Sequence, residues 1–409
     1  MPLHKSGDRR FDVVLYGATG FVGRQTVQYF ASNAQLKTSG LRWALAGRNL
    51  AKLEQVKQNC AGAGDAGVVV AASDDAQALD ALAKSTRVVL STAGPFALYG
   101  SALVAACVKH GTHYVDITGE TPWAFQMIAQ HHANAAKTGT RIIPFCGFDS
   151  VPSDLGAWLM TQTMQQRHRA ACVQVTAAFS VRGGVNGGTL ASLFNIMSSE
   201  QAQLVSNPFL LNPMPADRLQ IVANQDPVTP RYNADLKAWL GPFFMSVINT
   251  RVVRRSAALL GYGNDFRYQE YLRLGRGWVA GAAAASLSAG MGVSKMALSF
   301  SAVRRVAAAV VPKPGQGPSE ASMNSGSFRC ELVGKSASGD VLRGRITDNG
   351  DPGNRATTKM VCEAALCLAL DAAKLPGGTG YGGVLTPAAG LGDALVSRLR
   401  HSGMTLVID

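Results

Sequence analysis

Short apolar runs and stretches of helical spacing alternate through the N-terminal part of the chain. Each run of aliphatic and β-branched residues ends in glycine or polar residues, after which a stretch of helical spacing begins. The runs occupy residues 11–16, 41–47, 67–72, 87–91, 112–117 and 140–146. Strands that alternate with helices through short turns are typical of a parallel sheet covered by helices on both faces. The pattern therefore predicts an α/β fold in which residues 1–155 form a Rossmann-type doubly wound parallel sheet.

A second set of strand patterns follows the first lobe. Residues 172–181 form a long β-type run, and residues 327–334 and 341–347 alternate in polarity on either side of a turn. Two alternating runs joined by a short turn predict a β-hairpin, which we expect to extend the sheet that begins at Cys172. The prediction is a second α/β (α+β) lobe at residues 156–350, for substrate binding or dimerisation.

The C-terminal part, residues 351–409, combines two helical patterns with a final strand. The helices are expected at residues 356–374 and 391–401, and the strand at residues 404–408. The first of these helices is apolar on one face. We therefore expect the C-terminal part to return to the first lobe and to pack back on the Rossmann domain.

The turn after the first strand carries a glycine at every third position. Gly17 permits a tight turn, Gly20 lets the backbone approach a phosphate, and Gly23 lets the next helix lie close to the sheet. Unpaired N–H groups in the first turn of a helix attract an anion. The turn is therefore predicted to bind the pyrophosphate of a dinucleotide, and the alternative is a glycine-rich turn that binds nothing. The residues predicted to form this site are Gly17, Ala18, Thr19, Gly20, Phe21, Val22 and Gly23.

The end of the second strand distinguishes NADP from NAD. An NAD-selective domain carries Asp or Glu at this position, where the carboxylate accepts hydrogen bonds from the ribose. This chain has Arg48 there and Lys52 one turn later. A guanidinium can bond a 2′-phosphate in bidentate fashion, so NADP is predicted in preference to NAD. The alternative is a solvated arginine at the start of a helix.

Two further loops are predicted to contact the cofactor. Ser73 and Asp74 follow the third strand, and Asp74 either bonds the adenine amine or caps its helix. The loop after the fourth strand lies at the carboxyl end of the sheet, where doubly wound folds bind their ligands. We expect this loop to contact the nicotinamide ribose through Thr92, Ala93, Gly94, Pro95 and Phe96.

The candidates for proton transfer follow the fourth, fifth and sixth strands. They are Tyr99, Asp116, Glu120 and Asp149, and the sequence does not rank them. Ser153 or Asp154 is expected to cap a helix at residues 155–166. The glycine-rich segment after residue 181 either contacts the substrate or forms a loose connection. The predicted substrate contacts are Phe148, Ser150, Arg182, Asn186 and Thr189.

The amino-acid composition limits the kinds of binding partner and the cellular compartment to be expected. The 409 residues carry a net charge of +13, which favours an anionic partner such as a phosphorylated cofactor, an acyl carrier or anionic lipid. The basic residues are scattered and form no aromatic–basic platform, so nucleic acid is not predicted. The seven cysteines show no metal-ligand spacing, so no metal site is predicted and the thiols suit a reducing compartment. The polar N-terminus lacks the apolar core of a signal peptide, and a cytoplasmic location is expected.

An apolar segment at residues 277–303 has several interpretations. Residues 277–294 carry no charge, and their number approaches that of a membrane span. They are mainly alanine, glycine and serine, which favour membrane insertion weakly. Three alternatives remain open. The segment is a buried or interface helix, as in a homodimer; or it lies peripherally on a membrane or carrier surface; or it spans a membrane.

The motifs together resemble those of the saccharopine dehydrogenase-like oxidoreductases, and most closely those of their trans-acting enoyl reductase branch. This resemblance covers nearly the whole chain. It implies a Rossmann lobe with an inserted α/β lobe, NAD(P)H chemistry and, for the enoyl reductase branch, an acyl-thioester or lipid-like substrate. The motifs that carry it are the glycine turn at residues 17–23, Ala46-Gly47-Arg48, Ala93-Gly94-Pro95-Phe96, and residues 147–154, 187–192, 314–318 and 382–389.

The resemblance leads to one main hypothesis and two alternatives. The main hypothesis is an NAD(P)H-dependent oxidoreductase that reduces an enoyl or carbonyl group of an acyl or lipid-like substrate by hydride transfer. The first alternative is a non-catalytic nucleotide-binding protein associated with lipid or membrane. The second is a saccharopine-type amino-acid dehydrogenase.

Overall fold

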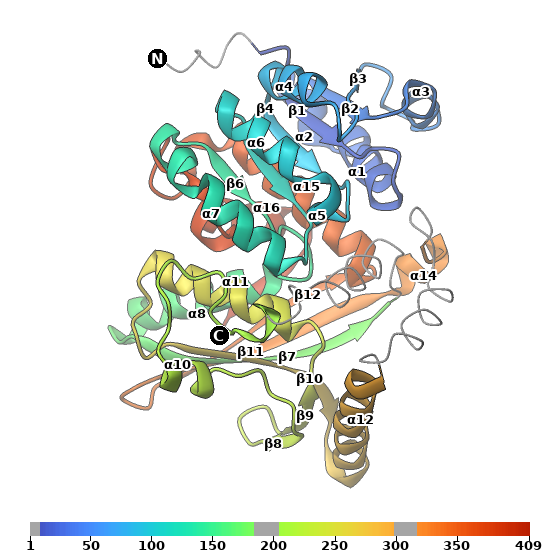
Figure 1. Ribbon diagram of the computed structural model, residues 1–409. Helices are drawn as coiled ribbons and strands as arrows, with labels where there is room; N and C mark the ends of the chain where they lie inside the picture. Colours follow the sequence, from blue (N-terminus) through green and yellow to red (C-terminus); the bar gives the residue numbers. More distant parts are fainter. Residues whose placement is uncertain (1–8, 184–203, 298–316) are drawn as a thin grey trace.

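The computed structural model describes residues 9–183, 204–297 and 317–409, which form two lobes built on two seven-stranded sheets (Figure 1). The first sheet has the strand order β13-β6-β5-β4-β1-β2-β3, with every pair parallel. Six of these strands lie in the six predicted apolar runs, which confirms the doubly wound sheet. The strands are β1 (Phe11–Tyr16), β2 (Trp43–Gly47), β3 (Gly67–Val70), β4 (Thr86–Ser91), β5 (His113–Asp116), β6 (Arg141–Ile143) and β13 (Gly383–Val384).

Helices cover both faces of the first sheet because its central strands are apolar on both sides. Val13 and Leu15 of β1 belong to one buried cluster, whereas Val14 and Tyr16 belong to another on the opposite face. The layer on the Val13 face contains α1 (Phe21–Ser32), α15 (Thr357–Leu370) and α16 (Pro387–His401), and the other contains α4 (Ala76–Ser85), α6 (Ser101–His110) and α7 (Thr121–Thr138). Shorter helices are α2 (Ala34–Ser39), α3 (Leu50–Gln58) and α5 (Phe96–Tyr99).

The second sheet is mixed and has the order β14-β12-β11-β7-β10-β9-β8. The predicted hairpin is confirmed: β11 and β12 pair antiparallel, and β11 pairs with the strand that begins at Cys172. The strands are β7 (Cys172–Arg182), β8 (Arg231–Asn233), β9 (Ala238–Pro242), β10 (Arg267–Gly275), β11 (Ser327–Ser336), β12 (Val341–Asn349) and β14 (Thr405–Ile408).

Two helices, α8 (Val151–His168) and α11 (Ser246–Leu260), lie between the second sheet and the first lobe (Figure 1). On the β7 strand, Val175, Ala177 and Phe179 are buried in the cluster that contains α8. Short helices α10 (Arg218–Ala223), α14 (Glu320–Ser325) and a π-helix, η2 (Pro352–Ala356), complete the described part of this lobe.

The final strand differs from its predicted position. It was expected to pack on the first lobe, but β14 pairs antiparallel with β12 of the second sheet. The β6 edge of the first sheet is already occupied by the two-residue strand β13, where Gly383 N donates to Thr140 O at 2.8 Å. The free edge of β12 accepts β14 instead, and Leu406 of β14 is buried there.

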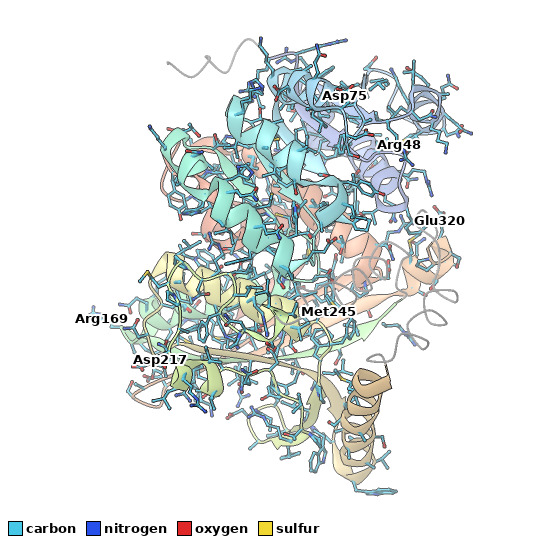
Figure 2. The ribbon with its side chains drawn as sticks, in the orientation of Figure 1. Arg48, Asp75, Arg169, Asp217, Met245 and Glu320 are labelled. Atoms are coloured by element: carbon cyan, nitrogen blue, oxygen red, sulfur yellow. The ribbon has the colours of Figure 1, made fainter. Side chains whose placement is uncertain are left out.

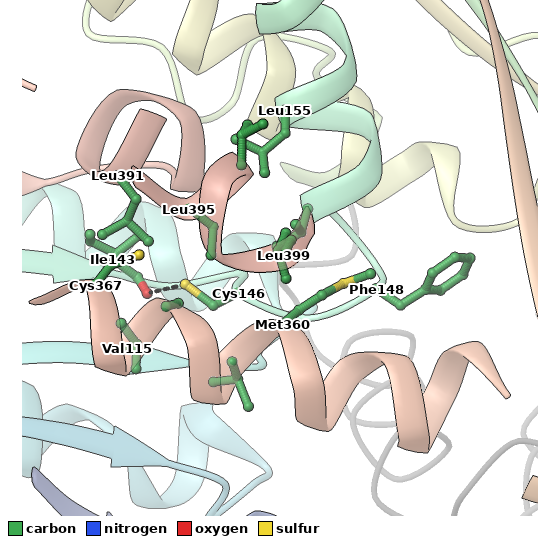
Figure 3. Close-up of a cluster of buried hydrophobic side chains, with 14 of the residues drawn as sticks. Val115, Ile143, Cys146, Phe148, Leu155, Met360, Cys367, Leu391, Leu395 and Leu399 are labelled. Carbon is green, nitrogen blue, oxygen red and sulfur yellow. Dashed lines mark hydrogen bonds between the residues drawn. The ribbon is translucent and has the colours of Figure 1, made fainter. Parts of the chain in front are cut away.

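One apolar core runs through both lobes. Figure 3 shows Val115 of the first sheet, Leu155 of α8 and Leu395 of α16 in one buried cluster. The same cluster includes Phe179 and Leu332 of the second sheet. The two lobes therefore share a continuous hydrophobic interior, with α15 and α16 at its centre.

The apolar segment at residues 277–303 is helical as far as the structure describes it, in α12 (Gly277–Ala297). Ala280 and Ala284 are buried against the sheet edge, and a Cβ at Gly281 would lie 2.9 Å from the Trp239 ring. Trp278 is 83% exposed at the other side of the helix start. Within the described ranges, no helix is long and apolar enough to cross a membrane.

Candidate functional site

The tight turn after β1 is possible because glycines occupy its crowded positions. Gly17 has φ of +84°, and a Cβ there would lie 2.9 Å from Ala93 N. A Cβ at Gly23 would lie 2.1 Å from Gly17 O, so α1 can pack this close to β1 only with glycine. A Cβ at Gly20 would meet only Gly17 O, at 3.2 Å. The turn therefore has the tight geometry that the spacing predicts.

The first turn of α1 lacks the side-chain cap that its neighbours have. The caps Asn33, Asn49 and Asp75 accept N–H groups at the starts of α2, α3 and α4. The N-cap of α1 is Gly20, which has no side chain to cap with, and no acidic residue lies in the first turn. The N–H groups at this end of α1 are thus left for an anion, as a dinucleotide pyrophosphate requires.

Arg48 and Asp74 follow β2 and β3, and both charges act on Tyr16 at the end of β1. Burial raises the pKa of Tyr16 to about 12, with a further rise from the Asp74 carboxylate and an opposing effect of the Arg48 guanidinium. Asn49 and Asp75 provide the helix caps here, so the capping alternative for Asp74 is wrong. Arg48, labelled in Figure 2 on the same side of the first lobe as Asp75, is exposed like Lys52.

The loop after β4 contacts the glycine turn through its backbone. Thr92 N donates to Tyr16 O at 2.9 Å, and Ala93 lies against Gly17. The Phe96 ring is buried beside Gly94, where a Cβ would meet Phe96 Cε2 at 3.3 Å, and it packs on Trp123 with a centroid distance of 5.6 Å. The part of this loop available to a cofactor is therefore its backbone from Thr92 to the cis Gly94–Pro95 bond. Ser73 is half-buried beyond β3.

Two of the predicted proton donors, Asp116 and Glu120, are saturated by hydrogen bonds inside the protein. Asp116 accepts from Tyr114 OH at 2.9 Å, from Thr118 N at 3.0 Å and from Phe145 N at 3.2 Å. Burial raises its pKa to about 7. Glu120 accepts Phe96 N at 2.8 Å and Ala97 N at 3.0 Å, and so caps α5. Both carboxylates fix loops at the carboxyl edge of the sheet.

Asp149 occupies a different environment at the junction of the lobes. A Cβ at Gly119 would lie 3.7 Å from Asp149 Oδ2 and 3.0 Å from Ile248 Cδ1, which places this carboxyl beside the loop after β5 and beside α11. Burial raises the pKa of Asp149 to about 6. None of the described residues donates a hydrogen bond to it. A carboxyl whose pKa is raised towards neutral pH and which lacks an internal partner can exchange a proton with a ligand.

The predicted substrate residues do not gather at one place. Phe148 is buried between Phe179 and Phe328, in edge-on contacts with ring centroids 6.0 and 4.9 Å away. Ser150 is buried and donates to Asn249 Oδ1 at 3.5 Å. Arg182 is exposed at the end of β7, and Asn186 and Thr189 lie outside the described residues. Among these residues, Ser150 lies next to Asp149 in the sequence, and Phe148 is a core residue.

Tyr99 lies in α5 and is 40% exposed. It follows the loop that contacts the glycine turn. The described residues show no hydrogen bond to its hydroxyl group. Its place on the surface of the first lobe leaves it available to a ligand but does not bring it to Asp149.

The expected helix caps Ser153 and Asp154 have other partners, because α8 begins at Val151. Ser153 Oγ donates to Glu270 Oε2 at 2.8 Å. Asp154 accepts Ala388 N at 2.8 Å and also binds Ser256 Oγ. These bonds join α8 to the second sheet and to α16. Asp149 lies just before the start of α8, so the same bonds help to fix its position at the lobe junction.

The sequence interpretation missed the contribution of α11 to this junction. Ile248 lies against Gly119, and Phe244, just before the helix, is 55% exposed. Met245 lies near the middle of the molecule in Figure 2, between the two lobes. In the Phe243-Phe244-Met245 run, Phe243 and Met245 are buried in the core and Phe244 is exposed, so the run alone could not have shown which of the three faces the junction.

The chain is similar to several known proteins. The family model described as the saccharopine dehydrogenase NADP binding domain matches residues 13–143. The chain is 38% identical over 420 residues to the trans-acting enoyl reductase of Mycobacterium leprae, covering 97% of both proteins. It is 36% identical over 419 residues to that of Mycobacterium tuberculosis, covering 98% of both.

A solved structure shares the fold. Apo saccharopine dehydrogenase (L-Glu forming) from Saccharomyces cerevisiae superposes with a TM-score of 0.52 at 13% identity. The match covers 98% of this chain and 99% of the yeast chain, so both lobes take part in the similarity.

Proposed function

Because the chain belongs to the family of the trans-acting enoyl reductases, we propose that it reduces the enoyl group of an acyl thioester held between its two lobes. The chain is an NADP-dependent oxidoreductase with a saccharopine dehydrogenase-like NADP-binding domain, and the predicted family and cofactor are confirmed. The substrate class follows from the enoyl reductase relatives, which are acyl-directed by name.

The chain's own residues fit NADP at the carboxyl edge of the first sheet. The uncapped first turn of α1 binds the pyrophosphate, and Arg48 with Lys52 binds the 2′-phosphate. When bound, NADPH supplies a hydride at the nicotinamide. The backbone of the loop from Thr92 to Pro95 supports that end of the cofactor.

Asp149 is the proposed proton donor, and its position carries the proposal. Hydride addition to the β-carbon of an enoyl thioester leaves the α-carbon needing a proton, which the carboxyl of Asp149 donates. The double bond would thereby become a single bond, and the Asp149 carboxylate would regain its proton from solvent. Ile248 and Phe244 provide an apolar wall for the acyl chain.

An acyl carrier is the proposed partner that delivers the thioester. The relatives are described as trans-acting, and the chain's net charge of +13 favours an acidic carrier. Membrane contact and homodimer formation are two further proposals. Both would involve α12, where Trp278 is exposed.

The test is steady-state NADPH oxidation with a panel of enoyl and keto thioesters of increasing chain length. The proposal expects turnover of enoyl thioesters that depends on Asp149 and not on Asp393, an exposed aspartate of α16. Asp393→Asn is therefore the matched control for Asp149→Asn. Tight NADPH binding without turnover of any thioester would instead favour the non-catalytic alternative, and turnover with an amino acid plus an oxo acid would favour a saccharopine-type reaction.

A further inference from the structure

A segment of the second lobe lies against the first residue of the phosphate-binding helix. A Cβ at Gly317 would lie 2.4 Å from two carbons of the Phe21 ring. Such a distance is far below any real contact, so a side chain at residue 317 requires the Phe21 ring, or the backbone that carries it, to move. The backbone of Gly317 does not need a positive φ, and the contact with Phe21 is therefore the constraint on this position. Gly317 is 296 positions away from Phe21 in the sequence.

A second contact lies one turn further along α1. Gln25 is buried, and its Oε1 accepts Arg355 Nη1 at 3.2 Å. Arg355 also donates from Nε to Asn324 Oδ1 of α14 at 3.0 Å, and its guanidinium lies 3.8 Å from Glu320. One arginine thus connects the phosphate-binding helix with the helix that follows Gly317.

The segment from Gly317 to Gly326 is fixed on the second lobe. Asp351 N donates to Met323 O at 2.7 Å, and Gly350 N donates to Gly326 O at 2.8 Å. Asp351 in turn accepts Arg355 N at 3.1 Å. Movement of this segment relative to Phe21 is therefore movement of one lobe relative to the other. Glu320 marks the segment beside the first lobe in Figure 2.

We propose that Gly317 is a positioning residue for NADPH, because it lets the second lobe close onto Phe21 and so holds the start of α1 in the orientation that binds the pyrophosphate. Phe21 is the first residue of α1, and its N–H is one of the groups without an internal cap. A side chain at position 317 displaces the Phe21 ring and, through it, the start of α1 or the second-lobe segment. The anion site then loses its geometry, although no residue of the glycine turn has changed. The proposal rests on the cofactor site of the proposed function.

The experiment compares Gly317→Val with Gly64→Val in the full-length protein. Overpacking of this kind costs enough free energy to weaken NADPH binding about tenfold, measured by fluorescence titration or calorimetry. Gly64 is a surface glycine without positive φ, and a Cβ there meets nothing within 4 Å, so its variant should bind NADPH like the wild type. The kcat of Gly317→Val at saturating NADPH should stay within about twofold, since the residue acts through binding.

Removal of the ring provides the decisive readout. Phe21→Ala keeps the backbone N–H but removes the clash, so Phe21→Ala in the Gly317→Val background should restore NADPH affinity towards that of Phe21→Ala alone. Such rescue is not expected from a general loss of stability. NADPH affinity in Gly317→Val equal to that of the wild type, or a loss that Phe21→Ala leaves unchanged, would overturn the proposal. A wild-type protein that does not bind NADPH would instead refute the proposed cofactor site itself.

Discussion

The loop after β5 and the loop after β6 end neighbouring strands, yet they use their carboxylates in opposite ways. Asp116 and Glu120 accept five hydrogen bonds between them, three from backbone N–H groups of other loops or of α5. Asp149 accepts none from the described part of the chain. Burial raises the pKa of both Asp116 and Asp149, to about 7 and about 6. A raised pKa alone therefore does not distinguish the two carboxyls, and the proposal of Asp149 as proton donor rests on its lack of an internal hydrogen-bond partner.

Asp149→Asn is expected to give the largest effect. The amide cannot donate the proton with the same efficiency, so kcat should fall by roughly 10²- to 10⁴-fold, the usual contribution of a general acid. Stability should not fall, because no described hydrogen bond is lost. Thioester-dependent NADPH oxidation and thermal unfolding measure the two quantities. Wild-type kcat in this variant would mean that Asp149 is not the donor.

Asp116→Ala tests the opposite side of the comparison. Three buried donors would lose their acceptor, and the free energy of unfolding should fall by about 3 kcal/mol, measured by urea denaturation. Asp116→Asn keeps one acceptor oxygen and should lose less. If Asp116→Ala unfolds like the wild type but has lost its activity, the roles assigned to Asp116 and Asp149 would have to be exchanged.

The pH dependence of the wild type sharpens the comparison. Asp149 must be protonated to act as the acid, so kcat should be highest below pH 6 and fall by about tenfold per pH unit above it. Asp149→Asn should lack this limb. The ordinary pKa of 3.8 is raised on folding, so the stability that this group contributes is present below pH 3.8 and lost as pH rises through about 6. Asp149→Asn should therefore gain stability relative to the wild type at pH 8.

Arg48→Ala tests a second pair of neighbouring residues, one with and one without a partner inside the protein, at the predicted 2′-phosphate site. Arg48 has no described partner in the protein, whereas Asn49 beside it is used as a helix cap. Loss of the guanidinium should weaken NADPH binding by about tenfold and leave NADH binding nearly unchanged. Titration with both nucleotides measures this ratio. Equal losses for NADPH and NADH would place the 2′-phosphate elsewhere.

The sequence predicted those strands that carry a hydrophobic pattern within their own residues. The first-sheet strands are long apolar runs, and the β11–β12 hairpin has period-two alternation, so each could be identified without its neighbours. The strand β13 has two residues, Gly383 and Val384, and is too short for any periodicity. Its pairing depends on the free edge of β6, which is a tertiary feature.

The candidate site shows the same limit more strongly. The residue types at the carboxyl edge predicted a cofactor site, but the ranking of Asp116, Glu120 and Asp149 depends on which N–H groups reach them in the folded chain. Arg254 and Arg255 are a further example, because adjacent arginines are mostly exposed and only tertiary contacts can bury them. They are buried, and donate to the carbonyls of Pro208 and Leu211 respectively.

The C-terminal origin of α15 and α16 bears on how the protein is made in the cell. Together with α1, these helices cover the face of the first sheet that contains Val13, Leu15, Val88 and Leu90, so part of that face stays uncovered while the chain leaves the ribosome. The nucleotide-binding half can complete its layers only after nearly all of the polypeptide has been translated. A fragment ending near residue 155 should consequently be prone to aggregation and require chaperones. Removal of α15 and α16 should destabilise the half of the molecule that is synthesised first.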